Sequence, residues 1–430
     1  MRILIKNGTV INPFGEKSGR IDILTDGSNV AAMGQGLSED GAKVIDAAGK
    51  LILPAFVDMH CHLREPGYEY KETIRTGTMA AIKGGYAAVA CMANTNPVAD
   101  CAAVIDFIKR KAQEAGYARV YPIGAVTKDL AGETLAEMGE LKEAGAVAVS
   151  DDGKPILNAN LLRNALLYAK NFDMLIISHC EEMGLANGGY MNEGAVSTEL
   201  GLKGIPRAAE EVMVARDVLL AENYNARIHI AHISTKGSVE IIRQAKKRGV
   251  NVTCETTPHY FSLTEEAVRG FDTNAKVNPP LRTQADVEAI VTGLQDGTID
   301  AIATDHAPHN ADEKNVEFAY ALNGISGLET AFSLCAMKLI QTKALQPEDI
   351  VRLMSYSPAK LLGVPGGSIR EGEPADICIA DLGERYELTS GRMASMGKNS
   401  PMLGETLQGV VTHTIVDGRL LMENGELTNP

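Results

Sequence analysis

Hydrophobic and polar residues alternate in short runs at both ends of this 430-residue chain. Near the N-terminus, ILIKNGTVI and RIDILTDGSNVAAMG contain Asn-Gly and Asp-Gly. Near the C-terminus, GVVTHTIVDGRLLMENGEL shows the same alternation and contains the same two dipeptides. Alternation broken by such dipeptides is typical of β-strands joined by tight turns. We therefore expect residues 1–53 and 365–430 to pair into one small β-sandwich domain.

Between these ends, eight short apolar runs alternate with longer segments of helical spacing. The runs are LILPAFVD, AAVACMA, RVYPIGAV, AVAVSD, MLIISHC, RIHIAHIS, NVTCETTP and DAIATDHAP. The intervening segments, such as KGSVEIIRQAKKRG, repeat apolar residues at helical intervals, and several end in glycine, which favours helix termination. Eight strand–helix units predict an α/β fold, a (β/α)8 TIM-type barrel over residues 54–364.

The composition narrows the class of protein. Hydrophobic residues make up 45% of the chain and charged residues 22%, as in ordinary soluble globular enzymes. A net charge of −14 and the absence of Trp argue against nucleic-acid binding, and no apolar run is long enough to span a membrane. Seven scattered cysteines without a C-x-x-C pair, and an N-terminus without a signal-peptide pattern, predict a reduced, cytoplasmic protein.

The histidines mark a candidate chemical site. In VDMHCHLREPG, His60 and His62 stand two residues apart, so on a strand their side chains face the same side. Active sites of (β/α)8 barrels are built at the C-terminal ends of the strands, and His/Asp ligands from several strands suit a zinc-type site with open positions. The histidines and aspartates at these predicted ends are His60, His62, Asp151, Asp152, His179, His232, Asp305, His306 and His309.

Each histidine taken alone has a plainer explanation. A single histidine at a strand end is more often a hydrogen-bonded polar residue than a ligand, whereas the coincidence at four strand ends favours a metal site. His229 is out of phase with His232, so we expect it to pack or to support a ligand. His259 is expected to hydrogen-bond or to act directly, and His413 to lie at the surface.

Six motifs in chain order make the interpretation specific: HCHLREPG, SDDG, SHCEE, IAHIS, VNPPLR and TDHAPH. Together with EGAVSTELGLKGIPRAAEEVMVARD they resemble the amidohydrolase superfamily and, within it, the dihydroorotases of the bacterial type, over nearly the whole chain. The resemblance implies zinc-dependent, reversible cyclisation of N-carbamoyl-L-aspartate to L-dihydroorotate in de novo pyrimidine (UMP) synthesis.

The resemblance also implies a role for each matching residue. Many relatives bridge two metals with a carboxylated lysine on the fourth strand, whereas this chain resembles the subgroup with an aspartate there, Asp152; Lys154 falls two positions late, and Asp151 is the alternative register. One or two zinc ions are implied, with two favoured. The implied ligands are His60, His62 and Asp305 for the more buried ion, His179 and His232 for the second, and Asp152 between them.

The implied chemistry needs a proton carrier and an anion-binding group. Zinc would lower the pKa of water and polarise the ring carbonyl, and Asp305 is the candidate general base as well as a ligand. A guanidinium holds a carboxylate through two parallel hydrogen bonds, which suits Arg64. The implied substrate contacts are His62, Arg64, Asn94, Asn278, His309, Asn323 and Gly324.

Two features near the substrate leave alternatives open. Relatives often have Pro-Phe-Gly where this chain has Leu322, Asn323 and Gly324, which is harmless if the backbone makes the contact and alters affinity if the aromatic ring matters. The polar stretch HNADEKNVEFAYALNGISG acts either as a mobile cover or as a fixed surface loop.

Other functions remain to be weighed. Allantoinase or dihydropyrimidinase would use the same fold and metal chemistry, but their substrates lack the ring carboxylate that Arg64 would bind. A non-catalytic partner of aspartate transcarbamoylase is disfavoured because every expected ligand is present. The resemblance is compatible with a homodimer and with association with aspartate transcarbamoylase, although the sequence reveals no interface.

Overall fold

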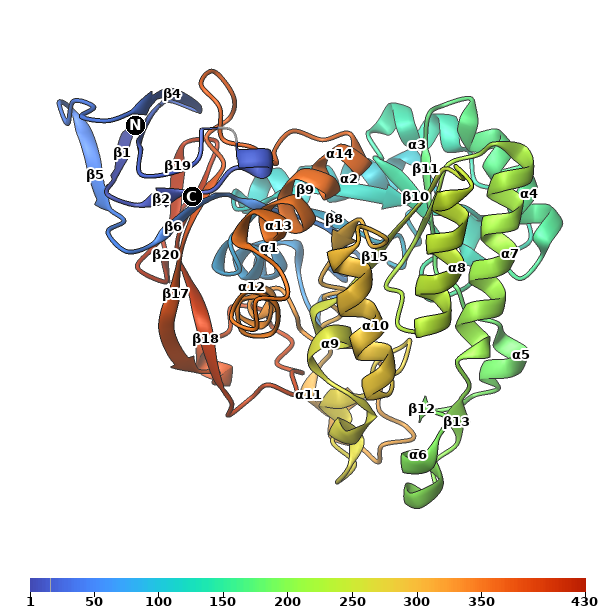
Figure 1. Ribbon diagram of the computed structural model, residues 1–430. Helices are drawn as coiled ribbons and strands as arrows, with labels where there is room; N and C mark the ends of the chain where they lie inside the picture. The colour runs from blue at the N-terminus through green and yellow to red at the C-terminus, as the bar shows by residue number, and fades with distance from the viewer. Residues whose placement is uncertain (16) are drawn as a thin grey trace.

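Eight parallel strands form the central sheet of the protein (Figure 1). The structure, a computed structural model, describes residues 1–15 and 17–430. The sheet has the order β16-β15-β14-β11-β10-β9-β8-β7, and a parallel bridge between Cys61 and His306 joins its two ends. The predicted barrel is thus confirmed. Its strands are β7 (Phe56–Cys61), β8 (Tyr86–Cys91), β9 (Arg119–Gly124), β10 (Ala148–Ser150), β11 (Leu175–Ser178), β14 (Ile228–Ile230), β15 (Val252–Thr256) and β16 (Ala301–Ile302).

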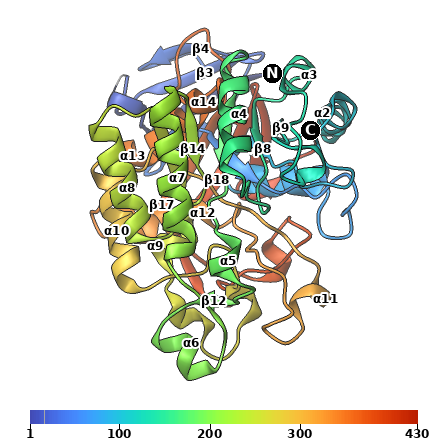
Figure 2. The same ribbon diagram turned by 90° about the vertical axis from the view of Figure 1, so that its right-hand side faces the viewer.

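Helices cover the outside of this sheet, and α4, α7 and α8 lie side by side on it (Figures 1 and 2). In α8, Thr235 caps the first turn by accepting from the Ser238 amide, and Val239, Ile242 and Ala245 form the buried face. The covering helices are α1 (Ile74–Lys83), α2 (Ala102–Ala115), α3 (Met138–Ala144), α4 (Ala159–Lys170), α7 (Ala208–Tyr224), α8 (Lys236–Lys247), α10 (Gln284–Gln295), α12 (Ala331–Cys335), α13 (Pro347–Val351) and α14 (Ser357–Leu362).

The first apolar run contains two strands rather than one. β6 (Leu51–Pro54) pairs antiparallel with β17 (Ile377–Glu387), whereas β7 begins at Phe56 and belongs to the barrel. Between them, the Ala55 amide donates to the carbonyl of Asp376. The run is continuous in sequence because both strands are buried, although in different sheets.

Strands from both ends of the chain form two further sheets, of order β4-β3-β1-β5 and β2-β6-β17-β18-β19-β20. They enclose a separate core that includes Ile3, Ile23 and Ile45 from the first sheet and Ile377 and Ile415 from the second. The remaining strands of these sheets are β1 (Arg2–Lys6), β2 (Thr9–Val10), β3 (Asp22–Asp26), β4 (Asn29–Gly34), β5 (Ala42–Asp46), β18 (Thr406–Val416), β19 (Arg419–Glu423) and β20 (Glu426–Leu427).

The expectation that His413 lies at the surface is wrong. His413 belongs to β18 and is only 4% exposed. Helix α12 packs against this strand, while Ile415 of the same strand contributes to the core between the terminal sheets. The strand is therefore buried on both faces, which leaves no solvent-facing side for the imidazole.

Short elements in the connections extend the rim of the barrel at the C-terminal ends of its strands (Figure 1). Among the helices of residues 1–15 and 17–430, none combines the length and the apolar character needed to cross a bilayer. The short elements are α5 (Met183–Ala186), β12 (Met191–Asn192), α6 (Ala195–Leu200), β13 (Gly204–Ile205), α9 (Pro258–Ser262) and α11 (Ala311–Lys314).

Candidate active site

A cavity of about 260 Å³ opens among the C-terminal ends of the barrel strands. It contains every residue singled out from the sequence as a ligand or substrate contact except His60, which is fully buried beneath it. Residues far apart in the chain meet here because parallel strands all end at the same rim. Of the singled-out residues, those lining the cavity are His62, Arg64, Asn94, Asp152, His179, His232, Asn278, Asp305, His309, Asn323 and Gly324.

Asp152 occupies the centre of the histidine cluster. Its Oδ1 lies 3.5 Å from His60 Nε2, 3.5 Å from His179 Nδ1 and 3.3 Å from His232 Nε2. Its other oxygen lies 3.5 Å from His62 Nε2. A carboxylate among four imidazole nitrogens is suited to lie between two cations, one on each side.

Asp305 completes a second group on one side of this centre. Its Oδ1 lies 3.1 Å from His62 Nε2 and 3.5 Å from His60 Nε2. Two sets of three ligand atoms lie close enough together to hold an ion: one from His60, Asp152 and His232, the other from His60, His62 and Asp305. His60 belongs to both sets.

The outer nitrogen of three of these imidazoles is held by a side-chain oxygen. His60 Nδ1 donates to Glu255 at 2.6 Å, and His62 Nδ1 donates to the amide oxygen of Asn94 at 3.0 Å. His179 donates from Nε2 to Glu181 at 3.2 Å. Such outer partners fix the tautomer of an imidazole and direct the lone pair of its other nitrogen at a metal.

These residues fit a divalent cation. His60 Nε2 is buried, has no hydrogen-bond partner among the described residues, and lies between Asp152 and Asp305. An imidazole lone pair left unpartnered beside two carboxylates, with no thiolate in the set, matches the nitrogen and oxygen ligands of a catalytic zinc-type site.

The charge balance of the cluster points the same way. Burial alone would raise the pKa of Asp305, but the charge on His60 and the hydrogen bond from His62 hold it below its usual range. For His179, burial alone would lower the pKa, but its bonds to Asp152 and Glu181 raise it to about 10. The carboxylates thus attract positive charge, which a metal ion would supply in place of protons.

Three residues of the site hold left-handed backbone conformations. The φ angles are +62° at Arg64, +34° at His232 and +46° at Asp305. Such conformations are costly for residues other than glycine and persist where the surrounding structure enforces them, commonly at functional sites.

Polar groups also gather around Arg64 and His309, which line the same cavity. Arg64 donates from Nε to the carbonyl of Pro308, and its terminal nitrogen lies 3.5 Å from His309 Nε2. His309 Nε2 donates to the Asn323 carbonyl at 2.8 Å, while the Lys71 ammonium lies 3.4 Å from Nδ1. Burial, followed by the charges of Arg64 and Lys71, lowers the pKa of His309 to about 3, so its ring is neutral.

The loop after His309 is tied down by buried ammonium groups. Lys276 donates to the carbonyls of Phe318 and Ala319 at 2.8 and 2.9 Å, and Lys314 donates to that of Leu322 at 2.7 Å. These bonds favour the fixed loop over the mobile cover. Asn323 meets His309 through its backbone carbonyl, a contact that does not depend on the side chain at this position.

Four residues flagged from the sequence lie beside the site rather than in it. Asp151 accepts from the amides of Val126 and Thr127, so it points away from the cluster and Asp152 is the residue that enters it. His306 lies 3.5 Å from Glu72 and accepts from the Gly327 amide. The other two are His229, 3.4 Å from Glu255, and His259, whose Nε2 has no partner among the described residues.

Sequence reasoning missed the supporting carboxylates. Glu255 is fully buried inside the barrel, and the alternation Thr253, Glu255 along β15 would have placed it on the same face as the predicted ligands. Glu181 stands within SHCEE, two residues after His179, and it also accepts from Asn278 at 3.0 Å. Acidic residues this close in sequence to the predicted ligands could have been identified as hydrogen-bond partners of those histidines.

Comparisons with known proteins agree with this geometry. A family model described as dihydro-orotase-like matches residues 49–238. The dihydroorotase of Geotalea daltonii is 56% identical over 422 residues, covering 98% of this chain and 99% of the relative. That of Acetivibrio thermocellus is 54% identical over 420 residues, covering 98% and 99%.

Solved structures of related enzymes share the fold. The L-hydantoinase (dihydropyrimidinase) of Arthrobacter aurescens superposes with a TM-score of 0.88 at 24% identity, covering 99% of this chain and 97% of its own. The D-hydantoinase (dihydropyrimidinase) of a Thermus species gives 0.84 at 25% identity, covering 100% and 97%. With relatives above 50% identity over nearly its full length, the chain belongs to the dihydroorotase family of cyclic amidohydrolases.

Proposed function

We propose that this site catalyses the reversible ring closure of N-carbamoyl-L-aspartate to L-dihydroorotate, the step that supplies pyrimidine synthesis. The observation that carries the proposal is the pairing of a His/Asp cluster with Arg64, Asn94 and His309 in one cavity. Dihydroorotate carries a ring carboxylate, and the Arg64 guanidinium and the Asn94 amide nitrogen offer donors that match it, with the His309 ring next to the guanidinium.

We propose zinc as the metal and two ions as the full complement. His60, His62 and Asp305 would hold one ion, His179 and His232 the other, with Asp152 between them. A divalent cation bound there would make water more acidic and polarise the carbonyl of the scissile amide. The three imidazoles whose outer nitrogens are fixed would be ready to bind without rotating.

Asp305 would move the proton. Its low pKa keeps the carboxylate ionised at neutral pH, and it lines the cavity beside His62. In ring opening it would take a proton from the attacking water and deliver it to the leaving ring nitrogen; in ring closure the same oxygen would receive the proton of the attacking nitrogen. One carboxylate thereby serves both directions of a reversible reaction.

The remaining residues would bind and orient the ring. Arg64, Asn94 and His309 would hold the carboxylate, and Asn278, with its amide tied to Glu181, would contact the ring. The backbone at Asn323 and Gly324 borders the same space. Fixing the carboxylate at one end sets the scissile amide over the metal ligands at the other.

A direct assay tests the proposal. Purified protein should hydrolyse L-dihydroorotate, and the loss of the substrate's ultraviolet absorbance measures the rate. The activity should disappear when a chelator removes the metal and return when zinc is added. Allantoin and dihydrouracil serve as comparison substrates, since both lack the ring carboxylate. Faster turnover of either one than of dihydroorotate would show that Arg64 does not select the substrate as proposed.

The setting of the enzyme is also a proposal. We expect a cytoplasmic homodimer that can associate with aspartate transcarbamoylase. Sedimentation of the pure protein, alone and mixed with that enzyme, measures both associations; a single monomeric species in both samples would contradict them.

A further inference from the structure

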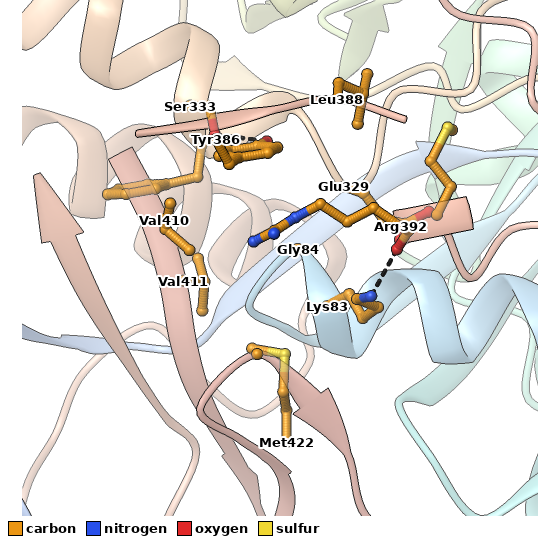
Figure 3. Close-up of a pocket in the computed structure, with 13 residues that line it drawn as sticks. Lys83, Gly84, Glu329, Ser333, Tyr386, Leu388, Arg392, Val410, Val411 and Met422 are labelled. Atoms are coloured by element: carbon orange, nitrogen blue, oxygen red, sulfur yellow. Dashed lines mark hydrogen bonds between the residues drawn. The ribbon is translucent and has the colours of Figure 1, made fainter. Parts of the chain in front are cut away.

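A segment between β17 and β18 crosses from the terminal sheets to the active-site rim. This crossing segment, residues 392–400, begins where the Arg392 guanidinium lies 4.3 Å from the centre of the Tyr386 ring. At the same point, the Lys83 ammonium at the end of α1 donates to the Arg392 carbonyl at 2.6 Å (Figure 3). A helix of the barrel therefore fixes the first residue of the crossing segment.

Two carboxylates of the barrel fasten the next residues. Glu329 accepts from the amides of Ala394 and Ser395 at 2.7 and 3.2 Å. Glu72 accepts from the Ser395 hydroxyl and from the Met396 amide. Glu72 is fully buried, so its bond from the Ser395 hydroxyl is shielded from water and holds the segment firmly.

Near the end of the segment lies Asn399, which is 4% exposed and uses its whole side chain. Its Oδ1 accepts from the His309 amide at 2.9 Å and from the Ser326 hydroxyl at 2.9 Å. Its Nδ2 donates to the carbonyls of Ala307 and Gly324 at 3.0 and 2.9 Å. One amide group thus joins two loops of the barrel rim through all of its donors and acceptors.

Those two loops carry residues that we proposed as substrate contacts. One loop contains His309, and the other contains Asn323, whose carbonyl accepts from His309, and Gly324, which lines the cavity. A second cavity, of about 290 Å³, is lined by both His309 and Asn399. Without the clamp, the His309 loop has room to move away from the substrate.

We propose that Asn399 is a positioning residue for substrate binding: it fixes His309 and the Gly324 backbone from outside the barrel strands. The inference rests on the proposed role of His309 in holding the substrate carboxylate. Asn399 itself does not line the substrate cavity, so its effect passes through the two loops. The C-terminal part of the chain would thereby shape the affinity of a site whose metal ligands all lie in the barrel.

The test is a kinetic and exchange comparison of Asn399→Asp and Asn399→Ala with wild type and Ser400→Ala. The aspartate keeps the shape but faces the Ala307 and Gly324 carbonyls without donors, and the alanine removes the clamp. Ser400 is equally buried, and its hydrogen bonds stay within residues 398–403. We expect KM for dihydroorotate to rise about tenfold or more in both Asn399 variants, kcat and metal content to stay within about threefold, and Ser400→Ala to match wild type.

Hydrogen exchange of the metal-free protein gives a readout that needs no activity. Amides of residues 306–311 and 322–327 should exchange faster in the Asn399 variants, with the rest of the barrel unchanged. Unchanged KM would overturn the proposal, because Asn399 would then have no effect on substrate binding. A fall in kcat alone with uniformly faster exchange would also overturn it, because that result marks a general structural role. A wild-type enzyme without dihydroorotate hydrolysis would instead refute the proposed function, and the exchange data would still report whether Asn399 holds the loops.

Discussion

Replacing Glu255 by glutamine tests whether a buried carboxylate inside the barrel strengthens metal binding at the proposed site. Glu255 is fully buried and accepts from His60 Nδ1 at 2.6 Å, the short distance of a charge-assisted hydrogen bond. Burial would raise its pKa, but the charge of His60 outweighs this and lowers the pKa to about 2, so the group is ionised at neutral pH. Glutamine keeps an acceptor for His60 and removes only the charge.

The expected effect is a loss of metal affinity with little loss of fold. Removing an outer partner of a ligating histidine weakens metal binding about 10- to 100-fold, or about 1.4 to 2.8 kcal/mol. We expect the upper part of this range, because His60 belongs to both sets of ligand atoms and no water reaches Glu255 to replace the charge.

Competition with a chelator of known zinc affinity measures the loss directly. Glu265→Gln is the matched control: Glu265 is also a buried carboxylate, and it accepts from Asn192 rather than from a ligand. Thermal unfolding separates misfolding from weakened binding. Zinc affinity equal to that of wild type in Glu255→Gln would refute the reasoning, because the carboxylate would then only fill space.

Three further changes probe separate parts of the molecule. Arg64→Met should raise KM for dihydroorotate at least about tenfold while the metal content stays at the wild-type level; loss of zinc would show that Arg64 supports the metal instead. Asp305→Ala should reduce turnover to background, since it removes base and ligand together, and substantial activity with intact metal would contradict that double role. His413 should contribute to acid sensitivity: burial lowers its pKa from 6.5 to about 4, so the unfolded chain binds a proton that the folded chain does not, and the free energy of unfolding should fall as pH drops from 6.5 toward 4. Between pH 7 and 5 this amounts to about 2 kcal/mol, and urea unfolding of His413→Gln should show a shallower decline; equal slopes would rule the contribution out.

The barrel was predictable because parallel strands buried on both faces leave continuous apolar runs in the sequence. Polar residues such as His179 and Asp305 then stand out at the ends of those runs. The position of Asp152 at the centre of the cluster was implied only by the family resemblance; the side chain of Asp151, one residue earlier, is used up by amides of a neighbouring loop. Strand spacing alone cannot distinguish two adjacent aspartates.

Residues that act through others left no comparable pattern. Glu255 reads as one polar residue in a strand, and its pairing with His60 depends on the closure of the sheet. Asn399 lies 90 residues after His309 in a stretch without regular periodicity, so nothing local connects the two. The boundary within LILPAFVD was missed for a related reason, since two strands of different sheets can share one apolar run.

The pairing of β6 with β17 has a consequence for synthesis on the ribosome. Strand β6 can pair early with β2, but its partners in β17 appear only after more than three hundred further residues have been made. Until then the apolar side chains of the first fifty residues lack the core partners that the C-terminal strands supply. The N-terminal part of the nascent chain would therefore expose apolar, aggregation-prone surface during most of translation. The last strands to be synthesised would be the ones that cover it.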